Sequence, residues 1–191
     1  MIEQSEDSTN ISILSLAEEL GTCLDSAGLC ITTAESCTGG LIAGAITEVA
    51  GSSGWFSHGV VTYSNEAKQT LLGVAASVFE QHGAVSEACV RRMAEGALQR
   101  SGADVAVSVS GIAGPGGATA DKPVGTVWIG WAVRSRDTVD TDKSHERPNQ
   151  DVKVDAREFL FSGDRRLVRR LAVIEALRGT ISIIDNVGMP K

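Results

Sequence analysis

The feature that most constrains the fold is a short polar segment between two apolar runs. The first run covers residues 29–32, the polar segment covers residues 33–40, and the second run covers residues 41–46. This order is typical of a strand, a tight turn and a helix. Such a turn places hydroxyl and thiol side chains beside the free N–H groups of a helix N-terminus, where negative charge is stabilised. The segment is therefore either a capped, glycine-containing turn or the site of a nucleophile.

The rest of the chain alternates between helical and strand patterns and ends on two strands and a helix. We expect helices over residues 10–27, 39–49, 65–72, 75–81, 87–101 and 165–184, and strands over residues 29–32, 55–63, 104–110, 125–134 and 152–161. Helices between early strands and a near-hairpin of late strands predict a three-layer α/β/α sandwich with a mixed, mostly parallel sheet. We expect a disordered lead over residues 1–9, one domain over 10–185 and a tail over 186–191.

Composition excludes several classes of function. Of the 191 residues 42% are hydrophobic and 21% are charged, as in an ordinary soluble domain. Aromatic residues make up 4% and the net charge is −7, which argues against a nucleic-acid partner. No segment is apolar enough to span a membrane, and the acidic N-terminus does not resemble a signal peptide, so we expect a cytoplasmic location. The four cysteines and three histidines lack metal-ligand spacing, which predicts no metal site.

Three polar loops follow predicted strands, at residues 35–40, 63–68 and 110–117. Ligands in such folds bind beyond the carboxyl ends of parallel strands. If the three strands are parallel neighbours, these loops meet at one rim of the sheet.

The first set of candidate catalytic residues is Ser36, Tyr63 and Lys68. A serine is a poor nucleophile until a base takes its proton, and no histidine lies in a comparable turn. A lysine with a lowered pKa can act as that base, and a tyrosine can relay a proton or orient the pair. The plainer interpretation is a solvated lysine and a packing tyrosine. Cys37 is the rival nucleophile, since a thiol at a helix N-terminus needs less activation, although a buried and inert thiol is the commoner outcome.

A glycine-rich loop follows the strand at residues 104–110. Its small residues allow a ligand to approach the backbone, and successive N–H groups can hold a phosphate. The loop matches neither a Walker A motif nor a dinucleotide fingerprint. Arg165, at the start of the last helix, can pair with a phosphate or carboxylate, but it is equally compatible with an ordinary surface arginine.

Six segments in order resemble the CinA C-terminal domain family, over roughly residues 10–185. They are residues 33–40, 61–68, 82–86, 107–115, 122–127 and 161–165. The resemblance implies an amidohydrolase that converts nicotinamide mononucleotide to nicotinate mononucleotide and ammonia, with no metal or other cofactor. It implies a serine nucleophile at Ser36, with Tyr63 and Lys68 as partners. Substrate-binding residues would then be Cys37, Thr38, Gly39, Gly40, Ser110, Gly111, Ile112, Ala113, Gly114 and Arg165.

Two alternatives stay open at the level of sequence. One is a hydrolase of a related amide, and the other is a non-enzymatic nucleotide-binding or regulatory module of the same fold. The role of the charged segment 137–150, which is longer than usual in the family, is not predicted. The oligomeric state is also open, although an exposed Trp128 or Trp131 would offer a face for a homo-oligomer.

Overall fold

The computed structural model describes residues 6–135 and 151–186. Its helices are α1 (Glu6–Ala27), α2 (Leu41–Thr47), α3 (Asn65–Leu72), α4 (Ala76–His82), α5 (Glu87–Ser101) and α6 (Arg165–Asn186), with a 3-10 turn, η1, at Ser52–Gly54. Its strands are β1 (Ile31–Glu35), β2 (Val60–Val61), β3 (Val105–Gly111), β4 (Thr126–Arg134) and β5 (Val152–Leu160). The charged segment 137–150 lies outside the described residues.

The strands form one mixed sheet in the order β2-β1-β3-β4-β5. The pairs β1–β2 and β1–β3 are parallel, whereas β3–β4 and β4–β5 are antiparallel. The prediction of a mixed sheet is confirmed, but the prediction that it is mostly parallel is wrong. The reason is that β3 and β4 are joined without a helix, so β4 runs back beside β3, and β5 in turn pairs antiparallel with β4.

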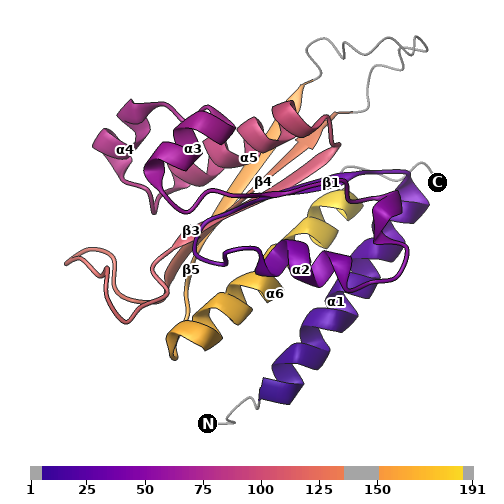
Figure 1. Ribbon diagram of the computed structural model, residues 1–191, viewed down its shortest axis with the longest axis horizontal. Helices are drawn as coiled ribbons and strands as arrows, with labels where there is room; N and C mark the ends of the chain where they lie inside the picture. Colours follow the sequence, from indigo (N-terminus) through magenta and orange to yellow (C-terminus); the bar gives the residue numbers. More distant parts are fainter. Residues whose placement is uncertain (1–5, 136–150, 187–191) are drawn as a thin grey trace.

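Helices lie on both sides of the sheet, with α1, α2 and α6 on one side and α3, α4 and α5 on the other (Figure 1). Successive side chains of β3 point to opposite faces of the sheet, as strand geometry requires. Val105, Val107 and Val109 pack into the core that contains α1 and α6, while Ala106 packs with residues of α5. The sheet therefore holds the helices of both sides in place relative to its carboxyl rim.

Several element boundaries differ from the predictions. Helix α1 begins at Glu6, within the predicted lead, and α2 begins at Leu41, after Gly39 and Gly40, whose φ angles are 60° and 98°. The predicted strand 55–63 contains only β2 and an isolated bridge between Phe56 and Ile31. Its first apolar residue, Trp55, packs into the core instead of extending the sheet.

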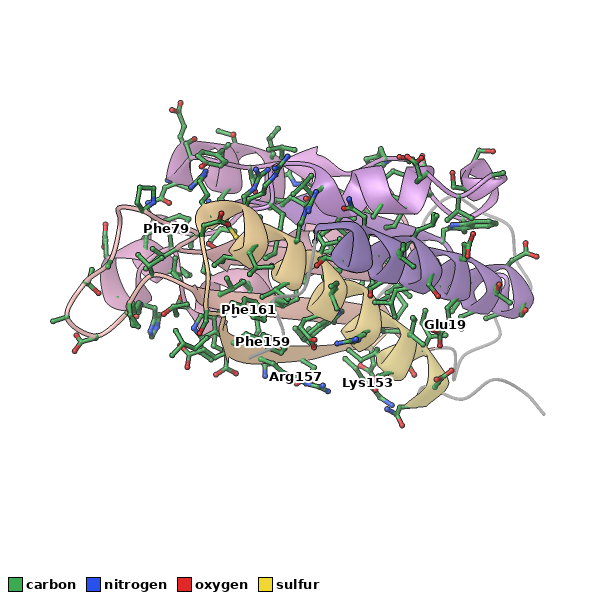
Figure 2. The ribbon with its side chains drawn as sticks, turned by 90° about the horizontal axis from the view of Figure 1, so that it is seen from below. Glu19, Phe79, Lys153, Arg157, Phe159 and Phe161 are labelled. Atoms are coloured by element: carbon green, nitrogen blue, oxygen red, sulfur yellow. The ribbon has the colours of Figure 1, made fainter. Side chains whose placement is uncertain are left out.

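Trp131, one of the two tryptophans considered as a possible exposed face, is only 1% exposed. Its indole N–H donates to the carbonyl of Ala176 in α6 at 3.2 Å, and the Arg157 guanidinium carbon lies 5.6 Å from its ring centroid. Arg157 belongs to the edge strand β5, close to the stacked rings of Phe159 and Phe161 (Figure 2). Trp131 therefore joins the sheet to α6 and is not available for a partner. In the described ranges, no helix has the length and apolar character needed to cross a membrane.

Candidate active site

The carboxyl ends of β1, β2 and β3 lie side by side, as the loop pattern predicts. Backbone hydrogen bonding between the parallel strands continues to their carboxyl ends. The Ser36 N–H, one residue beyond β1, donates to the Val109 carbonyl of β3 at 3.0 Å, and the Thr62 N–H, one residue beyond β2, donates to the Glu35 carbonyl of β1 at 2.7 Å. These bonds place Ser36 at the end of the central parallel strand, between the loops that follow β2 and β3.

Ser36 and Lys68 are in direct contact. The Lys68 Nζ lies 3.0 Å from the Ser36 Oγ, 2.9 Å from the Thr62 carbonyl oxygen and 3.5 Å from the Tyr63 carbonyl oxygen. Helix α3 positions the lysine in its first turns, since the Ser64 hydroxyl accepts a hydrogen bond from the Ala67 N–H and caps the helix. The backbone that ends β2 thus supplies two oxygens that aim the amine at Ser36.

The Lys68 side chain is buried, with 1% of the residue exposed. Burial lowers the pKa of Lys68, because a desolvated ammonium is less stable than a desolvated amine, and interaction with Cys89 and Cys37 opposes this effect. Burial therefore shifts Lys68 toward the neutral amine, which is the form able to accept a proton from Ser36.

Tyr63 lies at the same rim but is 60% exposed. Its hydroxyl accepts a hydrogen bond from Arg165 at 2.9 Å, and Arg165 also donates to the Gly114 carbonyl at 2.8 Å. In the part of the chain that the structure describes, no hydrogen bond joins the Tyr63 hydroxyl to Ser36 or Lys68. Arg165 therefore ties the loop after β2 to the loop after β3.

The glycine-rich loop begins as a continuation of the sheet. The Ile112 N–H donates to the Thr126 carbonyl and the Gly125 N–H donates to the Ile112 carbonyl, both at 2.8 Å. Ser110, Ile112 and Ala113 are buried. The backbone N–H of Ile112 is therefore committed to β4, and a phosphate would have to meet the loop farther along, near Gly114 and Arg165.

Cys37 is next to Ser36 in the turn, but its environment does not activate a thiol. Burial raises the pKa of Cys37 to about 11, and this effect outweighs the Cys37 N–H, Arg169 and Lys68, all of which favour the thiolate. A helix N-terminus would lower the pKa, yet α2 starts only at Leu41. The thiol is therefore protonated near neutral pH.

The structure also shows a role for Glu35, which we did not predict from the sequence. Its buried carboxylate accepts hydrogen bonds from the N–H groups of Gly40, Ile42 and Ala43, at 2.9, 3.1 and 2.8 Å. Glu35 thus satisfies the N-terminal N–H groups of α2 from within β1. An acidic residue a few positions before a predicted helix is the signal that would have indicated this cap.

Arg169 is the second residue that we missed. Its Nε donates to the Cys37 carbonyl at 3.0 Å and its Nη2 donates to the Thr38 carbonyl at 2.7 Å. Because Arg169 follows Arg165 by four residues in α6, both face the same side of the helix, and this spacing could have revealed it. The turn after β1 is therefore held by Glu35 from the sheet and by Arg169 from α6.

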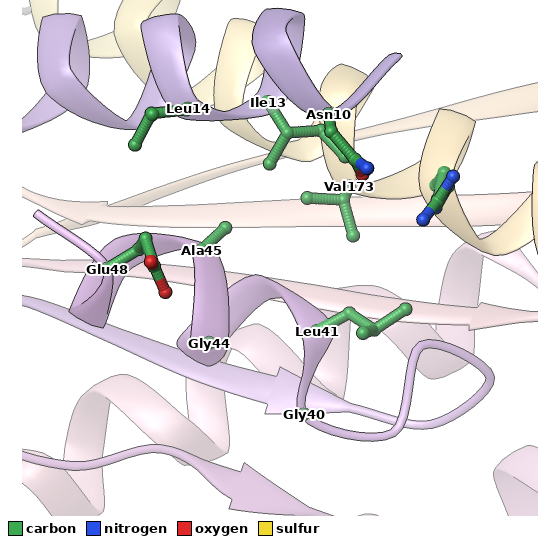
Figure 3. A pocket seen from close by; sticks show the side chains of 10 residues that line it. Asn10, Ile13, Leu14, Gly40, Leu41, Gly44, Ala45, Glu48 and Val173 are labelled. Atoms are coloured by element: carbon green, nitrogen blue, oxygen red, sulfur yellow. The ribbon is translucent and has the colours of Figure 1, made fainter. Parts of the chain in front are cut away.

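A separate apolar groove of about 420 Å³ lies between α1, α2 and α6 (Figure 3). Its lining includes Ile13, Leu14, Leu41 and Val173, and neither Ser36 nor Lys68 contributes to it. The groove reaches Gly40 but is not part of the Ser36–Lys68 site.

Together, the fold and the site define an α/β protein with a buried serine–lysine pair at the carboxyl rim of its parallel strands. The amino-acid sequence matches the CinA C-terminal domain over residues 13–184. The chain therefore belongs to the CinA C-terminal domain family.

Relatives of known name agree with this assignment. The chain is 53% identical to a nicotinamide-nucleotide amidohydrolase PncC of Enterobacter agglomerans, over 85% of this chain and 90% of that protein. It is 47% identical to nicotinamide-nucleotide amidohydrolase PncC of Escherichia coli strain K12, over 89% and 93% of the two chains. The crystal structure of a CinA superfamily protein from Klebsiella pneumoniae 700603 superposes with a TM-score of 0.79 at 35% identity, over 91% of this chain and 98% of that one.

Proposed function

We propose that this protein hydrolyses the carboxamide of nicotinamide mononucleotide to nicotinate mononucleotide and ammonia, through an acyl-enzyme on Ser36. The observation that carries the proposal is the 3.0 Å contact between the Ser36 hydroxyl and the buried Lys68 amine. Identity near 50% to amidohydrolases named for this substrate class supports the choice of substrate. A non-enzymatic binding module would have no need for a buried, desolvated lysine beside a serine.

The mechanism follows from the donors and acceptors around Lys68. A neutral amine has two N–H donors and one lone pair. The two carbonyls of Thr62 and Tyr63 match the donors, which leaves the lone pair to accept the Ser36 proton. Ser36 Oγ then attacks the amide carbon, and a backbone N–H of the following turn stabilises the oxyanion.

Breakdown of the tetrahedral intermediate returns the proton. The C–N bond breaks as Lys68 passes its proton to the nitrogen and ammonia leaves, with Tyr63 as the other candidate donor. A water molecule, deprotonated by Lys68, then attacks the ester, and Lys68 returns that proton to the Ser36 Oγ as nicotinate mononucleotide is released.

Substrate orientation comes from groups away from the reacting bond. Arg165 keeps guanidinium N–H groups beyond those given to Gly114 and Tyr63, and we propose that these bind the phosphate. The turn at Cys37–Gly40 and the loop at Ser110–Gly114 would enclose the pyridine and ribose. Binding of the remote phosphate supplies orientation for the reaction.

We also infer that residues 10–185 form one domain with the three-layer arrangement predicted from the sequence. One sheet contacts helices of both groups, and the two apolar clusters share its strands. This arrangement leaves the carboxyl rim as the place where the loops can take a ligand.

The test is ammonia release by the purified chain from nicotinamide mononucleotide, with nicotinamide riboside and nicotinamide as comparison substrates. We expect turnover of the mononucleotide, with a large loss of kcat/KM when the phosphate or the ribose phosphate is absent. Equal turnover of nicotinamide would indicate a hydrolase of a related amide. Calorimetric binding of the mononucleotide without ammonia release would indicate a binding module.

A further inference from the structure

Three backbone N–H groups of the turn after β1 are committed to other partners. The Ser36 N–H donates to Val109, and the Gly39 N–H donates to the Ser36 carbonyl at 3.1 Å. Gly40 donates to the Glu35 carboxylate. Among the hydrogen bonds of the described residues, the N–H groups of Cys37 and Thr38 donate to no protein acceptor, so both stay available to a substrate at Ser36.

Arg169 fixes the orientation of that N–H. The carbonyl of Cys37 belongs to the same peptide group as the Thr38 N–H, and this carbonyl accepts from the Arg169 Nε at 3.0 Å. In a trans peptide the carbonyl and the N–H point in opposite directions. Because Arg169 holds the carbonyl on the α6 side, the Thr38 N–H points away from α6.

A second bond prevents the peptide from rotating. The Arg169 Nη2 donates to the next carbonyl, Thr38, at 2.7 Å, so one planar guanidinium holds two consecutive peptide groups. Arginine suits this role because its N–H donors form a rigid fork. Rotation of the Cys37–Thr38 peptide would break this arrangement.

We propose that Arg169 is a positioning residue, which holds the Thr38 N–H as an oxyanion donor for the reaction at Ser36. This inference rests on the proposed function. Arg169 acts through the backbone and touches neither substrate nor reacting atoms. Arg165 lies one turn earlier in α6, at the rim. The guanidinium N–H groups that it does not donate to Gly114 and Tyr63 bind the substrate phosphate.

These two roles give opposite kinetic signatures. We expect Arg169→Met to lower kcat for nicotinamide mononucleotide about 100-fold, the scale of losing one oxyanion donor, with KM changed less than about threefold. We expect Arg165→Met to raise KM instead, since it removes a contact made equally to substrate and transition state. Arg169→Lys should retain part of the kcat, and guanidinium ion added to Arg169→Ala should restore part of it.

Arg178 provides the matched control on the same helix. It pairs with Glu175 at 2.8 Å, and 56% of its side chain is exposed, so Arg178→Met should leave both constants unchanged. Melting curves establish that each variant is folded, and if Arg169→Met is not, Arg169→Lys carries the comparison. A raised KM with unchanged kcat in the Arg169 variants would make Arg169 a phosphate ligand and overturn the proposal. Unchanged constants would also overturn it, whereas a wild-type chain that releases no ammonia would overturn the proposed function itself.

Discussion

At the scale of single residues, the candidate site depends on an amine that the fold removes from water. Lys68 is buried at the start of α3, and three oxygen atoms surround its Nζ within 3.5 Å. Burial lowers its pKa, so folding favours the neutral base. By contrast, burial raises the pKa of the neighbouring Cys37 to about 11 and keeps that thiol protonated. The same desolvation therefore lowers the pKa of the amine and raises the pKa of the thiol.

The pH dependence of the rate should report the lowered pKa of Lys68. Only the neutral amine accepts the serine proton, so kcat should rise along one limb as pH increases through this pKa and then stay constant. Activity should be lost as pH falls through the same value. Lys68→Arg should lose at least about 100-fold in kcat although it keeps the positive charge, because guanidinium stays protonated. Steady-state rates across pH for both proteins provide the measurement.

An active Lys68→Arg variant with the wild-type pH profile would mean that the base lies elsewhere. Tyr63 would then be the next residue to replace, with phenylalanine, because its hydroxyl lies at the same rim.

At the scale of elements, the sequence predicts most helices and strands but not all of their contacts. The capped helices α3 and α5 are confirmed, because Ser64 and Ser86 each accept an N–H bond from the residue three positions later. The strand predicted over residues 55–63 is mostly wrong, since tertiary packing of Trp55 overrides its β propensity. The clamp that Arg169 places on the turn joins segments 131 and 132 residues apart, so the sequence spacing can place Arg169 on the side of Arg165, but the two carbonyls that it holds are visible only in the fold.

The packing of α3 on α5 should control both stability and activity. A Cβ at Gly96 of α5 would lie 1.9 Å from the Leu72 carbonyl oxygen in α3, so Gly96→Ala must push α3 away. We expect a loss of about 1–3 kcal/mol in stability, together with a lower kcat because α3 carries Lys68. Urea unfolding and ammonia release measure the two effects.

Gly44 of α2 is the control, because a Cβ there meets no atom within 4 Å. Gly44→Ala should stabilise the protein by about 0.5–1 kcal/mol, as helix propensity requires. If Gly96→Ala were as stable and active as Gly44→Ala, the close packing of α3 on α5 would be refuted.

At the scale of the whole molecule, the sheet brings together loops that lie far apart in the sequence. The parallel order β2-β1-β3 sets the ends of three strands beside one another, and α6 returns to the same rim with Arg165 and Arg169. The alternation of strand and helix patterns along the chain is enough to predict this rim. The antiparallel pairing of β4 and β5 makes the sheet less parallel than predicted, and the start of β4 pairs with the loop after β3 at this rim.

Hydrolysis should not require a metal ion. Across residues 6–135 and 151–186, no three histidine, cysteine, aspartate or glutamate side chains cluster closely enough to hold one. Dialysis against a chelator should therefore leave the rate of ammonia release unchanged. A loss that added divalent metal reverses would contradict this prediction.

The central claim is that Ser36, activated by Lys68, is the nucleophile. The most direct measurement is ammonia release from nicotinamide mononucleotide by Ser36→Ala and Cys37→Ala beside the wild type. The two substitutions alter adjacent residues of one turn, so a general disturbance of the turn would affect both. We expect Ser36→Ala to be inactive and Cys37→Ala to keep most of the wild-type rate. An active Ser36→Ala together with an inactive Cys37→Ala would contradict the account and assign the reaction to the thiol.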